Sequence, residues 1–162
     1  MSMNNNFISN IILQEAGLPV PTPEIEHERN AAIYDILQEN VFGLDSQVGM
    51  DVPSGPFLLN LSIRNSLLVF LIENEAKMNN FELHLSLSPL KPIIKDYFEI
   101  CKSYFNAVKK LSPNQIEVID MGRRGIHLEG ARALTDRLNG KIKTDIPTAK
   151  RLFTLICALH FR

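Results

Sequence analysis

The period of the hydrophobic pattern changes at Pro89, and this change limits the folds open to the chain. Between residues 81 and 88, apolar and polar side chains alternate, which is typical of a half-buried strand. Between residues 90 and 108, apolar side chains instead recur at helical spacing. Strands therefore gather early in the chain and helices late, an order that predicts an α+β fold.

Two further strand-like runs, residues 57–64 and 67–73, precede the alternating run. Asn65 and Ser66 separate them, and this short connection predicts a β-hairpin. The segment ENEAKMNN then leads into the alternating run, and we expect it to form a turn. With a β-leaning run at residues 7–13, these segments predict an antiparallel sheet of about four strands with one wetter face.

The N-terminal region contains one helical pattern between two irregular stretches. Residues 1–23 are predicted to form an extended strand and a Pro-rich arm, because three prolines end this stretch. A helix is predicted from about Glu24, with Gly43 as its stop signal. Glycines and prolines in residues 44–56 predict a loop.

The C-terminal region is predicted to be mainly helical. Ser112 and Gln115 match the pattern of a capping box and predict a helix that reaches Leu138. A short strand is predicted at residues 141–146, and a last, centrally placed helix follows it. We expect residues 1–162 to form a single domain, with the helices packed on one face of the sheet.

The formal net charge of −1 conceals a division between the two halves of the chain. Residues 1–90 carry three basic and eleven acidic side chains, a charge of −8. Residues 91–162 carry fourteen basic and seven acidic side chains, a charge of +7. A net charge near zero argues against a general nucleic-acid binder, but the field of the basic half favours an anionic partner.

The cysteines and the apolar runs indicate a cytoplasmic protein. Cys101 and Cys157 lie at apolar positions of predicted helices, where free cysteine commonly behaves as a small buried hydrophobe. A secreted disulfide scaffold would carry more cysteines. The first residues lack the basic and apolar regions of a signal peptide, and no apolar run approaches the roughly 18–20 residues of a membrane span.

One segment inside the helix predicted after Ser112 is unusual. Its sequence, IDMGRRGIHLEG, holds Gly122, Gly125 and Gly130. Each glycine costs about 1 kcal/mol relative to alanine in a helix interior. We therefore expect either a close approach of another part of the chain or a break of the helix at residues 121–125.

If that helix is continuous, Asp120, Arg123, Arg124 and His127 share one of its faces, because their spacing is i, i+3, i+4 and i+7. Arginine offers paired donors to phosphate or carboxylate, and histidine titrates near neutral pH. These four residues are the candidate ligand-binding site. The alternative is structural: Asp120 pairs with Arg124, Arg123 pairs with an acid of the N-terminal half, and His127 caps or hydrogen-bonds the sheet.

A second candidate site lies in the segment EIEHER. His27 and Tyr34 lie on one side of the predicted helix, away from its apolar stripe. With Glu24 or Glu28, His27 would bind a metal or a partner. The alternative is a solvated acidic face. No H-x-x-x-H or C-x-x-C pattern occurs and the glycines match no phosphate loop, so neither a metal nor a cofactor is predicted.

Several segments together resemble a known group of proteins. They are EIEHER, KDYFEICKSYF, SPNQIEVIDMGRRGIHLEGA, DRLNGKI and TAKRLFTLICALHFR. These segments are similar to a family of small, uncharacterised alphaproteobacterial proteins, and IDMGRRG-H-EG is the most specific part. The resemblance implies a bacterial, cytoplasmic protein and assigns a role to none of its residues.

Three functions follow as hypotheses. The preferred one is a non-enzymatic binding or regulatory protein that presents Arg123, Arg124 and His127 to an acidic protein or a phosphorylated ligand. The second is a small enzyme acting on a phosphorylated or carboxylated metabolite, with Asp120 or His127 as general acid or base. Arg123 and His127 sealed in salt bridges, with no adjoining cavity, would exclude that enzyme.

The third hypothesis is association with nucleic acid or the ribosome through the basic half. The lysines that would form a stripe along one predicted helix are Lys91, Lys95, Lys102, Lys109 and Lys110. Binding through such a stripe would weaken steeply with salt.

Overall fold

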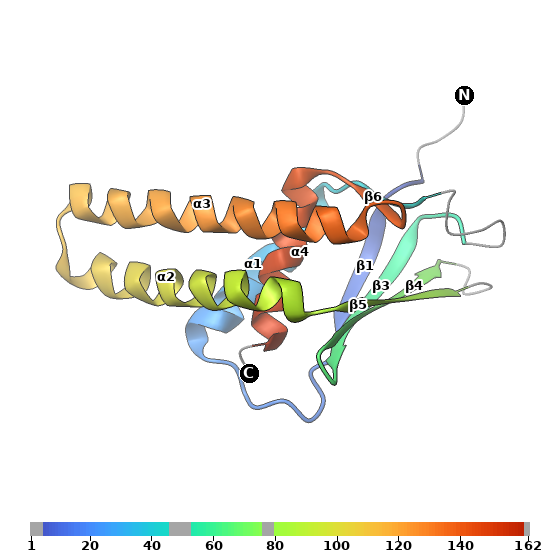
Figure 1. The fold of residues 1–162 in the computed structure, drawn as a ribbon, viewed down its shortest axis with the longest axis horizontal. Helices are drawn as coiled ribbons and strands as arrows, with labels where there is room; N and C mark the ends of the chain where they lie inside the picture. Colours follow the sequence, from blue (N-terminus) through green and yellow to red (C-terminus); the bar gives the residue numbers. More distant parts are fainter. Residues whose placement is uncertain (1–4, 46–52, 76–79, 161–162) are drawn as a thin grey trace.

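A computed structural model of the chain describes residues 5–45, 53–75 and 80–160, and Figure 1 shows how the helices and strands are arranged. The elements follow one another in the order β1 (Ile8–Leu13), α1 (Pro23–Gln38), β2 (Phe42–Leu44), β3 (Phe57–Arg64), β4 (Leu67–Asn74), β5 (Asn80–Ser86), the 3₁₀ helix η2 (Ser88–Leu90), α2 (Lys91–Lys110), α3 (Pro113–Leu138), β6 (Ile142–Thr144) and α4 (Ile146–His160). The predicted α+β class is confirmed.

The main sheet has the strand order β1-β3-β4-β5. As predicted, β3 pairs antiparallel with β4, and β4 pairs antiparallel with β5. β1, however, pairs parallel with β3, so the sheet is mixed rather than purely antiparallel. The chain passes from β1 to β3 through α1 and β2, and such a crossover brings two strands together in the same direction.

The hairpin predicted between the second and third strands of this order is confirmed. Arg64 lies opposite Leu67, so Asn65 and Ser66 form a two-residue turn. Both turn residues have positive φ, 52° and 63°, as a type I′ turn requires. The turn therefore fixes the register of β3 against β4.

The helices cover one face of the sheet (Figure 1), as expected. In β5, Leu83 and Leu85 are buried, whereas Glu82 and His84 are exposed on the predicted wetter face. The buried cluster draws side chains from both layers, among them Ile8, Ile36, Leu59, Phe70, Ile94, Leu134 and Phe153.

A second sheet pairs β2 with β6, which ties the N-terminal third of the chain to its end. α1 ends before the predicted stop signal, and Gly43 lies inside β2. The Asn40 side chain explains the earlier end. It donates to the Ile36 carbonyl at 2.7 Å, and it accepts from the Ile8 amide at 2.7 Å and donates to the Ile8 carbonyl at 3.0 Å. Asn40 thus satisfies the helix end and joins it to β1.

Two predicted connections are only partly covered by the structure. Residues 46–52 of the loop predicted at 44–56 lie outside the described residues, as do residues 76–79 of the turn predicted in ENEAKMNN. Leu44, assigned to the loop by sequence, is the last residue of β2.

α3 begins and ends as predicted and runs without a break through Met121–Gly125, so the alternative of a broken helix is wrong. The predicted capping box is present: Ser112 Oγ accepts from the Gln115 amide at 3.4 Å, and Gln115 Oε1 accepts from the Ser112 amide at 3.1 Å. The face shared by residues 120–127 therefore exists.

The three glycines of α3 have different surroundings. A Cβ atom at Gly130 would lie 2.4–2.6 Å from the ring of Phe153 in α4. A Cβ atom at Gly122 would meet Ile100 at an ordinary 3.6 Å, and one at Gly125 would meet nothing within 4 Å. Close approach of another helix therefore accounts for Gly130 and for neither of the other two.

α4 lies at the centre of the helical layer, and residues 152–159 are all buried. It packs against α1 and against α3, and α2 packs on α3. α1 does not pack closely on α2 or α3, so α1 and the α2–α3 pair flank α4. Within the part of the chain that the structure describes, no helix combines the length and the apolar character of a membrane span.

Gly130→Ala is expected to destabilise the protein by about 1–3 kcal/mol, because the new methyl group overlaps the Phe153 ring. Gly125→Ala is the matched control in the same helix, and it should stabilise by up to about 1 kcal/mol. Urea unfolding of both variants measures the two effects. Equal effects of the two substitutions would contradict the described contact between α3 and α4.

Candidate ligand-binding groove

Two cavities lie along α4, and we call them together the groove. The polar cavity has a volume of about 310 Å³, and the apolar cavity has a volume of about 410 Å³. Glu28 of α1, Tyr97 of α2 and Thr154 of α4 line both cavities, so the two meet at these residues. The groove exists because α1 and the α2–α3 pair pack on different sides of α4.

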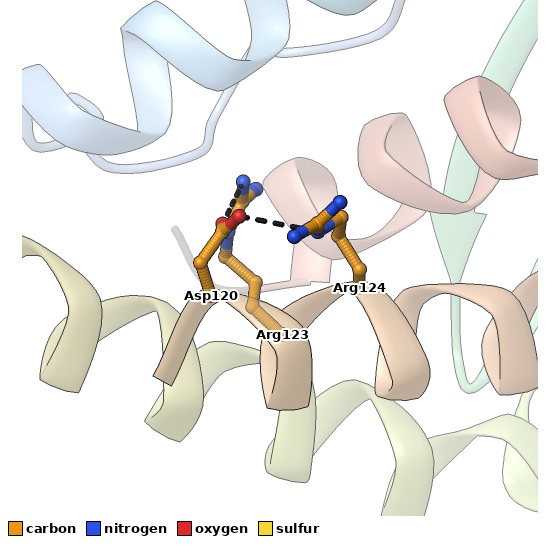
Figure 2. Close-up of polar contacts among 3 residues, drawn as sticks. All are labelled: Asp120, Arg123 and Arg124. Carbon is orange, nitrogen blue, oxygen red and sulfur yellow. Dashed lines mark hydrogen bonds and ion pairs between the residues drawn. The ribbon is translucent and has the colours of Figure 1, made fainter. Parts of the chain in front are cut away.

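Three of the four predicted site residues form an ion-pair cluster on α3. Figure 2 shows Asp120 between Arg123 and Arg124. Arg123 donates to Asp120 Oδ1 through Nε at 3.0 Å and Nη2 at 2.7 Å, and Arg124 Nε lies 3.1 Å from Oδ2. The guanidinium carbon of Arg123 lies 4.9 Å from the centre of the Tyr104 ring. Two cations thus share one carboxylate, which leaves an excess positive charge.

The alternative hypothesis, that these four residues have only structural roles, predicted three contacts. One of them is present and two are not. Asp120 does pair with Arg124. Arg123 pairs with Asp120 of its own helix rather than with an acid of the N-terminal half. His127 bonds α4 rather than the sheet, because α4 lies directly against this part of α3.

His127 is held in place by α4 and by an aromatic ring. Its Nε2 lies 2.8 Å from the Lys150 carbonyl oxygen and 2.9 Å from Thr154 Oγ1. Its ring stacks on Tyr97, with the two centres 5.0 Å apart and an angle of 21° between the planes. A carbonyl oxygen can only accept, so Nε2 carries the proton and Nδ1 holds a lone pair in the neutral ring.

The surroundings of His127 keep its imidazole neutral at pH 7. Its pKa is lowered to about 4, mainly by burial and also by the positive charges of Lys150 and Arg123, against the hydrogen bond to the Lys150 carbonyl, which raises it. Among the described residues, no fully buried side-chain nitrogen or oxygen lacks a hydrogen-bond partner. Nδ1, for which the described residues offer no partner, is therefore accessible to water or to a ligand.

Charged side chains of both signs line the polar cavity. Arg123, Lys150 and Arg151 contribute three positive charges, and Glu28 and Asp35 of α1 contribute two negative ones. The basic half and the acidic half of the chain therefore face each other across this cavity. When Asp120 and Arg124 of the adjoining cluster are also counted, four positive and three negative charges leave an excess of one positive charge, which favours an anion.

The apolar cavity has a different lining. Aromatic rings of α2, Phe98 and Phe105, stand on one side, and Cys157 and Ala158 of α4 lie at its base. Cys101 also lines it, and burial raises the pKa of the Cys101 thiol to about 11. The predicted burial of both cysteines is confirmed, and Cys101 stays protonated at neutral pH.

The second candidate site lies apart from the groove. His27 and Tyr34 are exposed on α1, and neither lines a cavity described above. Within residues 5–45, 53–75 and 80–160, no three His, Cys, Asp or Glu side chains gather as a metal site requires. The metal or partner role of His27 stays a prediction.

The predicted lysine stripe maps to α2. Lys91, Lys95, Lys102 and Lys109 follow helical spacing along one side, and Lys110 points elsewhere. The ammonium group of Lys102 lies over the ring of Phe98, at 5.5 Å from its centre. Nucleic-acid binding by this stripe stays a prediction.

Sequence patterns missed several residues of the groove. Lys150, Arg151 and Thr154 are polar residues in a mainly apolar helix, and this was the available signal. Glu28 continues the apolar stripe of α1 at helical spacing, whereas from sequence it is predicted only as a partner of His27 or as part of a solvated acidic face. Tyr97 falls on the apolar stripe predicted at residues 90–108, and it is indeed buried.

Comparisons with known proteins agree on one family. A family model described as "Uncharacterised protein family (UPF0262)" matches residues 5–162. The UPF0262 protein of Ruegeria pomeroyi is 57% identical over 159 residues, 98% of this chain and 99% of the relative. That of Paracoccus denitrificans is 54% identical over 159 residues, 98% of each chain. No solved structure shows a significant match. The resemblance to a family without an assigned activity is confirmed.

The low pKa of His127 makes stability depend on pH. The folded state resists protonation of this ring, so its contribution is present above the ordinary pKa of 6.5 and is lost as the pH falls toward 4. We expect a loss of about 3 kcal/mol from this group between pH 7 and pH 4. Urea unfolding at a series of pH values measures it. His127→Gln should lose less stability over that range, and an unchanged pH profile would contradict the assignment.

Proposed function

This chain belongs to the UPF0262 family, whose members are uncharacterised. From the geometry of the groove, we propose that the protein is a non-enzymatic binding protein for an anionic ligand. The observation that carries the proposal is the lining of the polar cavity by Arg123, Lys150 and Arg151. Cations in a partly enclosed cavity attract an anion more strongly than cations on an open surface, because less water screens them.

The shape of the site favours a small ligand over an acidic protein. The cations line a cavity of about 310 Å³, a size at the lower end of the range of about 300–1,000 Å³ for small-molecule sites. An acidic protein would instead need cations on a broad exposed surface. Arg124, with 64% of its side chain exposed, is the member of the cluster best placed for such a partner.

The chemistry of the cluster supports binding over catalysis. The cavity beside Arg123 and His127 satisfies one requirement of the enzyme hypothesis. However, a histidine with a pKa near 4 is a weak base, and at pH 7 it is not the protonated imidazolium that would act as a general acid. Asp120 already accepts hydrogen bonds from Arg123 and pairs with Arg124. A binding role requires no change in either residue.

We also propose that this binding takes place in the cytoplasm. The support is the pair of free, buried cysteines, a usage that suits a reducing compartment.

Arg123→Gln is expected to weaken binding of inorganic phosphate and of acetate about tenfold, because it removes a charged donor from the cavity. Lys150→Gln should act in the same direction. NMR titration of backbone amides in α3 and α4 measures both affinities, and added chloride should weaken them.

Arg132→Gln is the matched control, because Arg132 lies exposed on the same helix and does not line the cavity. It should leave both affinities unchanged. Equal weakening by Arg132→Gln and Arg123→Gln would mean that only the general field of the basic half acts. Amides of the groove that do not respond to either anion would contradict the proposal.

A further inference from the structure

We propose that the groove binds an amphipathic anion, with its charged head in the polar cavity and its apolar chain in the apolar cavity. The inference rests on the proposed function for the head and adds the chemical class of the ligand. It starts from the junction of the two cavities at Glu28, Tyr97 and Thr154.

One side of α4 forms the base of both cavities. Lys150, Thr154 and Ala158 follow one another at intervals of four residues, so they lie on the same side of the helix. Lys150 lines the polar cavity, Ala158 lines the apolar cavity, and Thr154 lines both. At 1.5 Å per residue the strip from Lys150 to Ala158 is about 12 Å long. The two cavities thus form one elongated site with charge at one end.

The apolar cavity offers what a hydrocarbon chain needs. Phe98 and Phe105 of α2 provide aromatic surface, and Ile25 of α1 adds an aliphatic side chain to the same lining. Its volume of about 410 Å³ is within the range of small-molecule sites. Removing apolar surface from water favours binding by about 0.8 kcal/mol for each methylene group buried. A ligand that filled the polar cavity alone would leave this apolar surface wet.

The charges along the groove define where the head lies. Three cations and one acid line the polar end, namely Arg123, Lys150, Arg151 and Asp35. Glu28 lies at the junction, and Glu24 and Lys102 line the apolar cavity. A negative charge is therefore favoured at the polar end and disfavoured at the junction. Carboxylate and phosphate heads both suit arginine and lysine, so the shared chemistry is a single anionic group on an apolar chain.

A series of carboxylates tests the inference. We expect the affinity to rise from acetate to hexanoate to decanoate, by up to about fourfold for each methylene buried. Decyl phosphate, compared with inorganic phosphate, distinguishes the phosphate from the carboxylate form of the same ligand class. Isothermal titration calorimetry and NMR titration of the full chain, below the concentration at which each compound forms micelles, measure the affinities.

Two variants locate the chain. Ala158→Phe fills the apolar cavity and should remove the dependence on chain length. Since Ala158 is buried, a second variant, Phe105→Gln, replaces a half-buried side chain of the same cavity and should reduce the dependence without loss of the fold. Glu28→Gln should tighten decanoate binding, because it removes a like charge from the junction.

The outcomes separate the two proposals. Acetate binding without any rise along the series would overturn the amphipathic ligand and leave the proposed function standing. Decanol binding as tightly as decanoate, with no response to Arg123→Gln, would overturn the proposed function. A rise along the series that persists unchanged in Ala158→Phe and in Phe105→Gln would overturn the placement of the chain in the apolar cavity.

Discussion

The burial of α4 is the constraint on which the rest of the structure depends. This helix is apolar on nearly every side between residues 152 and 159, so it must be covered by other elements. α1 covers one side and α3 another, and the closest contact lets the Phe153 ring lie against the bare backbone at Gly130. Because α1 and α2 do not close over the remaining strip, the groove follows from the way the helices cover α4.

The fold determines where the acidic half and the basic half of the chain meet. The ion pairs of Asp120 and of Glu15 each join residues of the same half of the chain. The two halves meet instead across the polar cavity, where Glu28 and Asp35 face the cations of α3 and α4. Some charges of the acidic and the basic half thus line a cavity instead of pairing with each other inside the protein. Burial is the main cause of the low His127 pKa, and the positive charges of Lys150 and Arg123 add to it.

Local signals in the sequence predicted most of the secondary structure, and long-range contacts decided the rest. The hairpin at Asn65, the capping box at Ser112 and the continuous α3 each depend on residues close together in the chain. The parallel pairing of β1 was missed because it depends on a crossover through α1. The early end of α1 was missed because Asn40 bonds a distant strand.

The candidate site was predicted in part for the same reason. Helical spacing placed Asp120, Arg123, Arg124 and His127 on one face, since that spacing is a property of a single helix. It carried no information about Lys150 or Thr154, which come to His127 only through the packing of α4 on α3. The apolar cavity was not predicted, because its lining comes from three separate helices and resembles a core in sequence.

The position of a bound amphiphile tests the account most directly. Intermolecular nuclear Overhauser effects between decanoate and the protein would give the position of each end of the ligand. We expect the methylene beside the carboxylate to contact Tyr97 and His127, and the terminal methyl group to contact Phe105 and Ala158. Contacts in the reverse order, or contacts confined to the exposed apolar side chains of α3 that line neither cavity, Val118 and Met121, would contradict it.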